Sequence, residues 1–268
     1  MLSVYLQRFN EALIKFQKKF PRTTWSKEFK INLINDFAFF SSRIEDSKLE
    51  YGDTIKFLND ELVKKENLTS LLQINNHKEV LKEIIDRYEN FELTEDSLKS
   101  IHRNLMGNEL SWNGDYKPEL VGNYRNYQVV GYREPFFPNR EYNPHYNLEI
   151  IMSSYTDLFQ RTLNDIDNSA DETHLITALA YFHNKFLNDI HPFADGNGRV
   201  CRIVMGTVMM KKGCPPVFAQ IVNNADMEEY INVIIKCEDE SSNVPFVKFL
   251  AEGMSNYLDE KIRKISNQ

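Results

Sequence analysis

A short polar segment between two apolar stretches carries the residues best suited to chemistry in this 268-residue chain. Residues 190–202 run IHPFADGNGRVCR. Gly196, Asn197 and Gly198 tolerate left-handed backbone and can turn successive N–H groups inward. Such a cradle at a helix N-terminus binds phosphate, because both the N–H donors and the helix dipole favour anions. We therefore predict an anion site formed by these three residues, directly before a helix.

The charged side chains of the same segment fit a polyphosphate. Arg199 and Arg202 are three residues apart on the first turn of the expected helix, so both reach the same side, and two guanidinium groups suit more than one phosphate. Asp195 is a hard oxygen ligand of the kind that Mg²⁺ prefers. Histidine is the side chain that can change its charge near neutral pH, so His191 can act as a general base.

A capped helix with surface charges explains any one of these residues alone, but it explains the whole set poorly. The segment has no GK[S/T] sequence after its glycines, which excludes a Walker-type loop. The set therefore favours a nucleotide site of another kind.

The elements that must position this segment are mostly helices. Glycine and proline are scarce, with 10 and 9 residues, which favours long helices over hairpins. Thr94, followed by Glu95 and Asp96, predicts the start of a helix that reaches Met106. Apolar residues at helical spacing predict further helices over about 3–18, 29–43, 54–64, 77–88, 148–159, 171–189, 199–212, 226–236 and 244–262. The helix over 199–212 is apolar on all sides, so we expect it at the centre of the fold.

Residues 107–146 have a different character and are rich in glycine and proline. The stretch YRNYQVV, residues 124–130, is the best strand candidate, and Gly131 after it indicates a turn. We expect a long ordered loop with one hairpin, and a loop of this length inside a domain is usually functional.

Composition and charge limit the classes of protein that this chain can be. The hydrophobic share of 42% and the charged share of 26% exclude extensive disorder. The net charge of −7 argues against a general nucleic-acid binder. The three cysteines have no CxxC spacing. Charged residues interrupt the first sixteen positions, and no apolar run could span a bilayer. We expect a reduced, cytoplasmic protein with no membrane segment.

The segment HPFADGNGRVCR matches the motif HxFx[D/E]GNGRxxR at every specified position, and the chain resembles the Fic (Fic/Doc) family. Flanking segments are also similar, over roughly residues 30–260. The resemblance implies a mostly α fold with a small β-hairpin flap at about 123–135. It also implies an N-terminal helical region over 1–90, which includes an inhibitory helix at about 29–46, and a Fic core over 91–268, together one compact unit. The similar flanking segments are FHNKFLNDI, LKSIHRNLM, GNYRNYQVV, MEEYINVI and VPFVKFL.

The resemblance implies a protein adenylyltransferase, which moves AMP from ATP to a Ser, Thr or Tyr hydroxyl of a target protein and releases pyrophosphate. His191 would deprotonate the hydroxyl, and Asp195 would hold Mg²⁺. Phe193 would anchor the loop in the core. The backbone at Gly196, Asn197 and Gly198 would cradle the α- and β-phosphates, and Arg199 and Arg202 would grip the distal phosphates. Kinase-like members carry lysine at the position of Gly198, so glycine favours AMP transfer.

An inhibitory motif precedes the core in this resemblance. Residues 41–46 run SSRIED and are similar to [S/T]xxxE[G/N], with Ser41 and Glu45 matching and Asp46 departing. Glu45 would pair with Arg202 and compete with the γ-phosphate for the same guanidinium. The simpler interpretation is an ordinary glutamate at a helix end.

The flap would dock an extended segment of the target by adding a strand, although a plain surface hairpin is the alternative. Its candidate residues are Tyr124, Arg125, Tyr127 and Val129. His183 and His102 lie among core residues of their helices, so we expect hydrogen-bonded structural histidines.

Other activities stay open at this stage. The same site could remove AMP from modified proteins, with Glu45 orienting water. The chain could also be a catalytically silent Fic-fold regulatory or binding protein, although the intact His191, Asp195 and both arginines count against this. The expected partners are ATP and a target protein of unknown identity, with no nucleic acid evident. A homodimer that locks the inhibitory helix is a further option.

Overall fold

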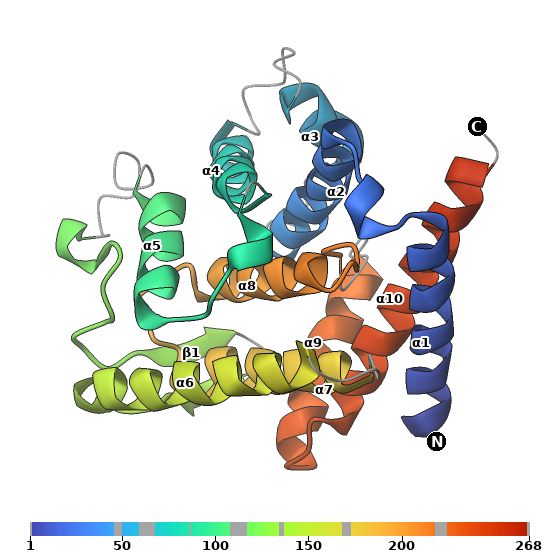
Figure 1. Ribbon diagram of the computed structural model, residues 1–268. Coiled ribbons are helices and arrows are strands. Elements are labelled where there is room, and N and C mark those ends of the chain that lie inside the picture. The colour runs from blue at the N-terminus through green and yellow to red at the C-terminus, as the bar shows by residue number, and fades with distance from the viewer. Residues whose placement is uncertain are drawn as a thin grey trace.

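The computed structural model describes residues 2–45, 50–58, 68–85, 87–107, 117–133, 137–167, 173–217 and 224–266 (Figure 1). This part of the chain is mostly helical, as the sequence predicts. The helices are α1 (Leu2–Lys19), α2 (Lys27–Glu45), α3 (Tyr51–Leu58), α4 (Leu68–Ile85), α5 (Glu95–Met106), α6 (Leu148–Asp167), α7 (Thr173–Asn184), α8 (Asn197–Lys211), α9 (Asn224–Asp239) and α10 (Val244–Ser266).

The helix α8 lies at the centre, with other helices around it (Figure 1). It packs against α2, α4, α5 and α7, and its side chains are buried without interruption from Arg199 to Met210. A helix that is apolar on all sides is stable only when all of its sides are removed from water. The prediction of a central helix is therefore confirmed. The N-terminus of α8 is thereby held rigidly by its neighbours.

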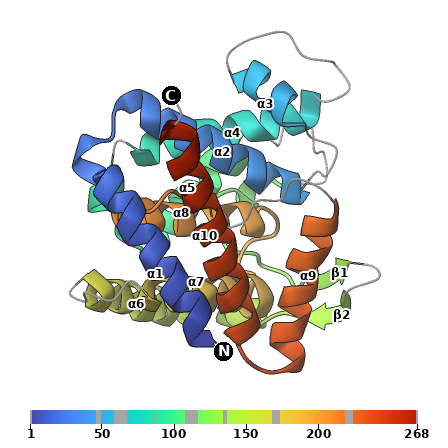
Figure 2. The same cartoon turned by 90° about the vertical axis from the view of Figure 1, so that its right-hand side faces the viewer.

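The first and the last helix of the described chain lie together. The helices α1 and α10 run side by side in both views (Figures 1 and 2). The apolar positions Phe9, Leu13 and Phe16 recur at helical spacing along α1, and all three are fully buried. This stripe explains why the segment forms a helix and which side of it faces the rest of the molecule.

The helix α5 starts after Thr94, as the sequence predicts, and a capping box with Ser97 fixes this start. The Thr94 hydroxyl accepts the Ser97 N–H at 3.1 Å, and the Ser97 hydroxyl accepts the Thr94 N–H at 2.9 Å. Two N–H groups that the helix itself cannot satisfy are thus paired. This cap sets the direction of α5, which carries His102 toward the motif loop.

The two described strands form a small antiparallel hairpin of β1 (Val130–Arg133) and β2 (Phe137–Glu141). Val130 pairs with Glu141, and the register is irregular between Gly131 and Arg133. Figure 2 shows the hairpin beside α9. The predicted strand over 124–130 is wrong except for its last residue, because the backbone before Val130 makes contacts to the motif loop instead of to a neighbouring strand.

The helix α7 does not continue unchanged to residue 189. It passes into a π-helix over Lys185–Ile190, a wider turn that is frequent next to functional sites. The His191 N–H closes this turn by donating to the Phe186 carbonyl at 2.8 Å. The π-helix therefore determines where the motif loop begins.

Candidate active site

The motif loop, residues 191–196, connects the π-helix to α8. His191 adopts left-handed backbone with φ 48°, which is uncommon for a residue with a side chain. Its ring nitrogen Nδ1 lies 2.9 Å from the Leu187 carbonyl. A carbonyl can only accept, so Nδ1 carries the proton and Nε2 is the basic nitrogen of the neutral ring. The Tyr142 ring stacks on the imidazole at 4.1 Å between centroids. This orientation suits a general base.

The backbone at Gly196 fits glycine alone. Its φ is 76°, and a Cβ atom added there would lie 2.8 Å from the Met106 sulfur. Gly196 caps α8, so the first amides of that helix have no partner within the helix. They are arranged as an anion site requires.

The Asn197 side chain closes the motif loop. Its Oδ1 accepts the Phe193 N–H at 2.9 Å, and its Nδ2 donates to the Phe193 carbonyl at 2.8 Å. The amide is thus occupied by the backbone, and it shapes the cradle from within. Phe193 itself is fully buried, which places it as the expected anchor of the loop.

Both motif arginines are almost completely buried, at 5% exposure for Arg199 and 1% for Arg202. Arg199 lies 3.8 Å from the Asp195 carboxylate. The Nε of Arg202 donates to the Ser41 hydroxyl at 2.8 Å. Burial strengthens the attraction between a guanidinium and an anion, because water screens the pair less.

Asp195 could hold a magnesium ion. Its side chain is 53% exposed, although Oδ1 also accepts the Gly196 N–H at 2.6 Å. Among the described residues, no group of three or more His, Cys, Asp or Glu side chains could enclose a metal. Mg²⁺ is commonly held by one or two carboxylates together with substrate phosphates and water, so a single carboxylate beside an anion cradle fits this ion.

His102 contacts the motif loop through hydrogen bonds and ring stacking. Its place in the sequence does not indicate these particular partners. Its Nδ1 accepts the Gly122 N–H at 2.8 Å, so Nε2 carries the proton and donates to the Asp195 carbonyl at 3.1 Å. The ring stacks on Phe193 at 4.0 Å. Burial lowers the pKa of His102 to about 4, which keeps this donor and acceptor pattern fixed. The prediction of a structural histidine is confirmed.

Arg125 joins the segment before the hairpin to the motif loop. Its exposure is only 2%. Its Nε donates to the His191 carbonyl at 2.8 Å, and its own N–H donates to the Pro192 carbonyl at 2.9 Å. The remaining guanidinium nitrogens donate to the carbonyls of Tyr127, Asn143 and Ile190. The side chain is therefore directed into the protein, where it fixes the backbone at the candidate base.

The other flap candidates are divided between interior and surface. The Tyr124 hydroxyl donates to Glu95 at 3.0 Å, and its ring contacts Phe193. Tyr127 is 44% exposed, and Val129 is half-buried. Tyr124 is half-buried like Val129, so Tyr124, Tyr127 and Val129 all leave surface for a partner.

The inhibitory candidates lie on α2, which packs against α8. Ser41 is buried and contacts Arg202, as described above. Glu45 is the last residue of α2, one helical turn beyond Ser41 and thus on the same face. The Glu45 side chain and Asp46 lie outside the described part of the structure.

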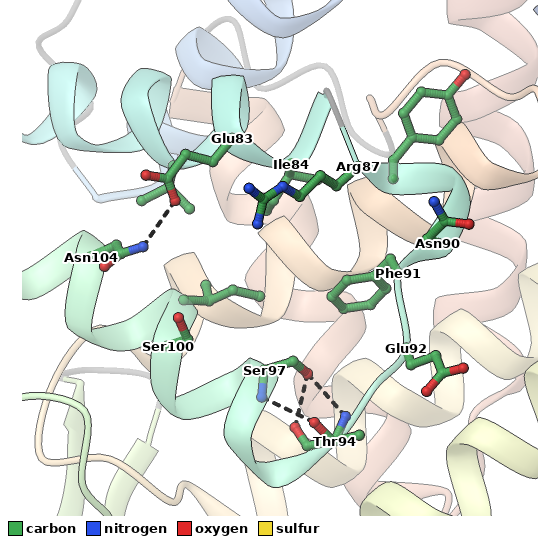
Figure 3. Close-up of a pocket in the computed structure, with 13 residues that line it drawn as sticks. Glu83, Ile84, Arg87, Asn90, Phe91, Glu92, Thr94, Ser97, Ser100 and Asn104 are labelled. Carbon is green, nitrogen blue, oxygen red and sulfur yellow. Dashed lines mark hydrogen bonds between the residues drawn. The ribbon is translucent and has the colours of Figure 1, made fainter.

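A separate cavity of about 640 Å³ lies between α4 and α5. Figure 3 shows its lining side chains, with a hydrogen bond of 3.0 Å from Asn104 to Glu83 across it. Apolar residues such as Ile84 and Phe91 line it together with the charged Arg87. None of the motif residues line it, so it is distinct from the candidate active site.

His183 lies in the core, on α7. It is fully buried, and its ring nitrogens contact the Tyr230 hydroxyl at 2.7 Å and the Asn184 side chain at 3.1 Å. The prediction of a hydrogen-bonded structural histidine is confirmed. Within the described residues, no helix is both long and apolar enough to cross a membrane.

Comparison with known proteins agrees with this geometry. Residues 92–209 match the Fic/DOC family. The protein adenylyltransferase Fic of Drosophila persimilis is 31% identical over 194 residues, which are 69% of this chain and 33% of that protein. The protein of the same name from Nematostella vectensis is 29% identical over 168 residues, 62% of this chain and 34% of that protein. The chain thus spans about a third of the length of these relatives.

Solved structures show the same fold. A Fic domain containing signaling protein from Bacteroides thetaiotaomicron superimposes with a TM-score of 0.72 at 21% identity, over 95% of this chain and 94% of that one. The sequence match, the fold and the intact motif loop agree with one another. The chain belongs to the Fic/DOC family.

Proposed function

We propose that this protein is an adenylyltransferase that moves AMP from ATP to the hydroxyl of a Ser, Thr or Tyr side chain of a target protein. The observation that carries this proposal is the juxtaposition of a basic His191 Nε2 with the N-terminus of α8 and two buried arginines. The hydroxyl oxygen bonds to the α-phosphorus, while the bond from that phosphorus to the β-phosphate bridging oxygen breaks. Pyrophosphate leaves, and His191 takes the hydroxyl proton.

The phosphates would be bound by the chain's own donors. The first amides of α8 would receive the α- and β-phosphates, and Arg199 and Arg202 would receive the distal ones. Asp195 would hold Mg²⁺, which neutralises phosphate charge when bound. Transfer of this kind depends mainly on positioning and charge neutralisation, and the motif loop is held by Arg125, His102 and Asn197 for both.

We further propose that Glu45 inhibits the enzyme by occupying the guanidinium of Arg202. The contact between Ser41 and Arg202 supports this proposal, because Ser41 precedes Glu45 by one helical turn of α2. The exposed Tyr127 and the half-buried Val129 would contact the target segment. We expect the active protein in the cytoplasm, with a homodimer as one arrangement that could hold α2 in place.

Transfer of label from α-³²P-ATP with Mg²⁺ tests these proposals. Four proteins are compared, each alone and with cell lysate: the parent, Glu45→Gly, Glu45→Gly with His191→Ala, and Glu45→Gly with His174→Ala. His174 is an exposed histidine on α7 and serves as the matched control. We expect label on protein in Glu45→Gly and in the His174 control, and no label when His191 is replaced.

Other results would redirect the assignment. Equal labelling of the parent and Glu45→Gly would contradict the inhibitory role of Glu45. An absence of label from every sample, with ATP binding intact by calorimetry, would contradict AMP transfer. It would favour the reverse reaction, which the same assay detects as loss of label from a previously modified protein, or a binding role.

A further inference from the structure

A buried histidine on α4 lies beside the proposed inhibitory contact and has no role in the chemistry described above. His77 is fully buried, and its Nε2 lies 3.3 Å from the Ser41 hydroxyl. The Phe37 ring packs edge-on against its imidazole at 6.1 Å. His77 thus contacts the same serine hydroxyl that Arg202 contacts.

The donors in this group define the direction of each hydrogen bond. Arg202 can only donate, so its Nε–H donates to the Ser41 oxygen at 2.8 Å. The single Ser41 proton is then directed to another acceptor, and His77 Nε2 is the acceptor at hydrogen-bond distance. We assign the tautomer in which His77 Nε2 is unprotonated and accepts this proton, so the neutral ring carries its own proton on Nδ1.

This arrangement leaves one buried hydrogen-bond donor of His77 without a partner among the described residues. His77 Nδ1 is buried and has no hydrogen-bond partner in the part of the chain that the structure describes. A buried donor without a partner is unfavourable. Burial, with the positive charges of Arg202 and Arg199 nearby, also holds the pKa of His77 well below its usual range. The ring therefore stays neutral and keeps its acceptor directed at Ser41.

The consequence for Arg202 is a fixed guanidinium plane. The group is planar, so a hydrogen bond at Nε determines where the two Nη nitrogens point. Those nitrogens are the pair that grips a carboxylate or phosphate through two parallel bonds. The position of Ser41, and through it that of His77, therefore affects how tightly the Arg202 guanidinium binds an anion.

We propose that His77 is a positioning residue, which acts through Ser41 to orient the Arg202 guanidinium toward the anion that it grips. The inference rests on the proposed function, since that anion is taken to be the γ-phosphate of ATP when Glu45 is removed.

The test uses calorimetric binding of ATP and of ADP, each with Mg²⁺, to variants made in the Glu45→Gly background. ADP lacks the γ-phosphate, so the ratio of the ADP and ATP dissociation constants isolates the grip on that group. We expect His77→Phe, which keeps a ring but removes the acceptor, to lower this ratio about tenfold. His77→Gln, whose Oε1 can accept the Ser41 proton, should restore most of it. Ser41→Ala removes the same link from the other side and should match His77→Phe.

A purely structural role would give a different pattern. His183→Phe replaces another fully buried histidine, whose ring nitrogens contact Tyr230 and Asn184, and should lower stability without changing the ratio. A ratio above one in Glu45→Gly that neither His77→Phe nor Ser41→Ala alters would overturn this inference alone. A ratio of one already in Glu45→Gly would overturn the proposed grip of Arg202 on the γ-phosphate, and this inference with it.

Discussion

Gly196 is the residue at which the backbone of the motif loop tolerates least change. A Cβ atom there would meet the Met106 sulfur at 2.8 Å, and its φ of 76° is one that side chains rarely adopt. We expect Gly196→Ala to cost about 1–2 kcal/mol of unfolding free energy, because the left-handed conformation is strained for any L-residue. Nucleotide binding should weaken as well, since the first amides of α8 move with this residue. Chemical denaturation and calorimetry measure the two effects.

A second glycine gives the matched control. Gly52 lies in α3, and an added Cβ would meet no atom within 4 Å. Gly52→Ala should therefore be neutral or stabilising by up to about 1 kcal/mol, since alanine is the better helix former. Equal losses in both variants would contradict the special role of Gly196.

Replacement of Arg125 should also have a specific effect on the motif loop. Its guanidinium donates to the carbonyls of His191 and Ile190, among others, and Arg125→Met would leave these buried acceptors without their charged donor. We expect a loss of about 3 kcal/mol in stability and a fall of more than tenfold in AMP transfer by the Glu45→Gly enzyme. Denaturation and the labelling assay measure these changes.

Arg161→Met is the control for Arg125, because Arg161 is exposed on α6. A surface substitution of this kind should change stability by less than about 0.5 kcal/mol and leave transfer unaltered. If Arg125→Met behaved like the control, the guanidinium would not be what fixes the loop.

The expected roles of the motif residues can be inferred from the sequence, because their chemistry depends on neighbours in the sequence. Gly196, Asn197 and Arg199 form one local turn, so their spacing alone indicates an anion site. The roles of His77, His102 and Arg125 depend on partners that are distant in the chain, and no local pattern indicates them. The expectation that Arg125 faces a target shows the difference, since its buried contacts arise only when the loop and the flap meet.

At the scale of elements, one buried carboxylate joins α2 to two other helices. Asp36 on α2 accepts hydrogen bonds from Tyr51 of α3 at 2.8 Å and from Tyr257 of α10 at 2.7 Å. Lys261 of α10 also pairs with it at 2.6 Å. Burial and the Asp36 charge raise the pKa of Tyr257 well above its usual value, so its hydroxyl stays a donor. The helix proposed to be inhibitory is thus held at its middle as well as at Ser41.

Removal of the buried hydroxyl tests this connection. We expect Tyr257→Phe to lower stability by about 1–2 kcal/mol, because a buried carboxylate loses a donor. Hydrogen exchange in α2 should become faster. Tyr51 is 45% exposed, so water can replace its hydroxyl, and Tyr51→Phe should cost less. A larger loss from Tyr51→Phe would contradict the assignment of Tyr257 as the main contact.

Most helices and the presence of a hairpin were predictable, but the position of the hairpin's strands was not, for a physical reason. Apolar spacing determines which face of a helix is buried, and α1 and α8 follow that rule. A short strand depends on its pairing partner, and within the segment 124–129 the backbone N–H and the guanidinium of Arg125 donate to carbonyls of the motif loop. The strand pairing starts only at Val130, beyond the Arg125 contacts.

At the scale of the whole molecule, buried neutral histidines make the fold sensitive to acid. Burial lowers the pKa of His183 to about 3, and the pKa of His77 lies well below its usual value. Below a pH of about 6.5, the ordinary pKa of histidine, these histidines bind protons in the unfolded chain but not in the folded chain. The free energy of unfolding therefore falls as the pH decreases below 6.5, with the loss for His183 complete only near its folded pKa.

The slope of the unfolding free energy against pH can be tested by replacing one histidine at a time. Each such histidine contributes about 1.4 kcal/mol per pH unit, so His183→Gln should reduce the slope between pH 6 and 5 by about that amount. Glutamine can still bond to Tyr230, which keeps the variant folded. Urea unfolding at a series of pH values measures the slope. His174→Gln, at an exposed position on α7, should leave the slope unchanged, and an unchanged slope in His183→Gln would show that His183 takes up its proton in the folded protein.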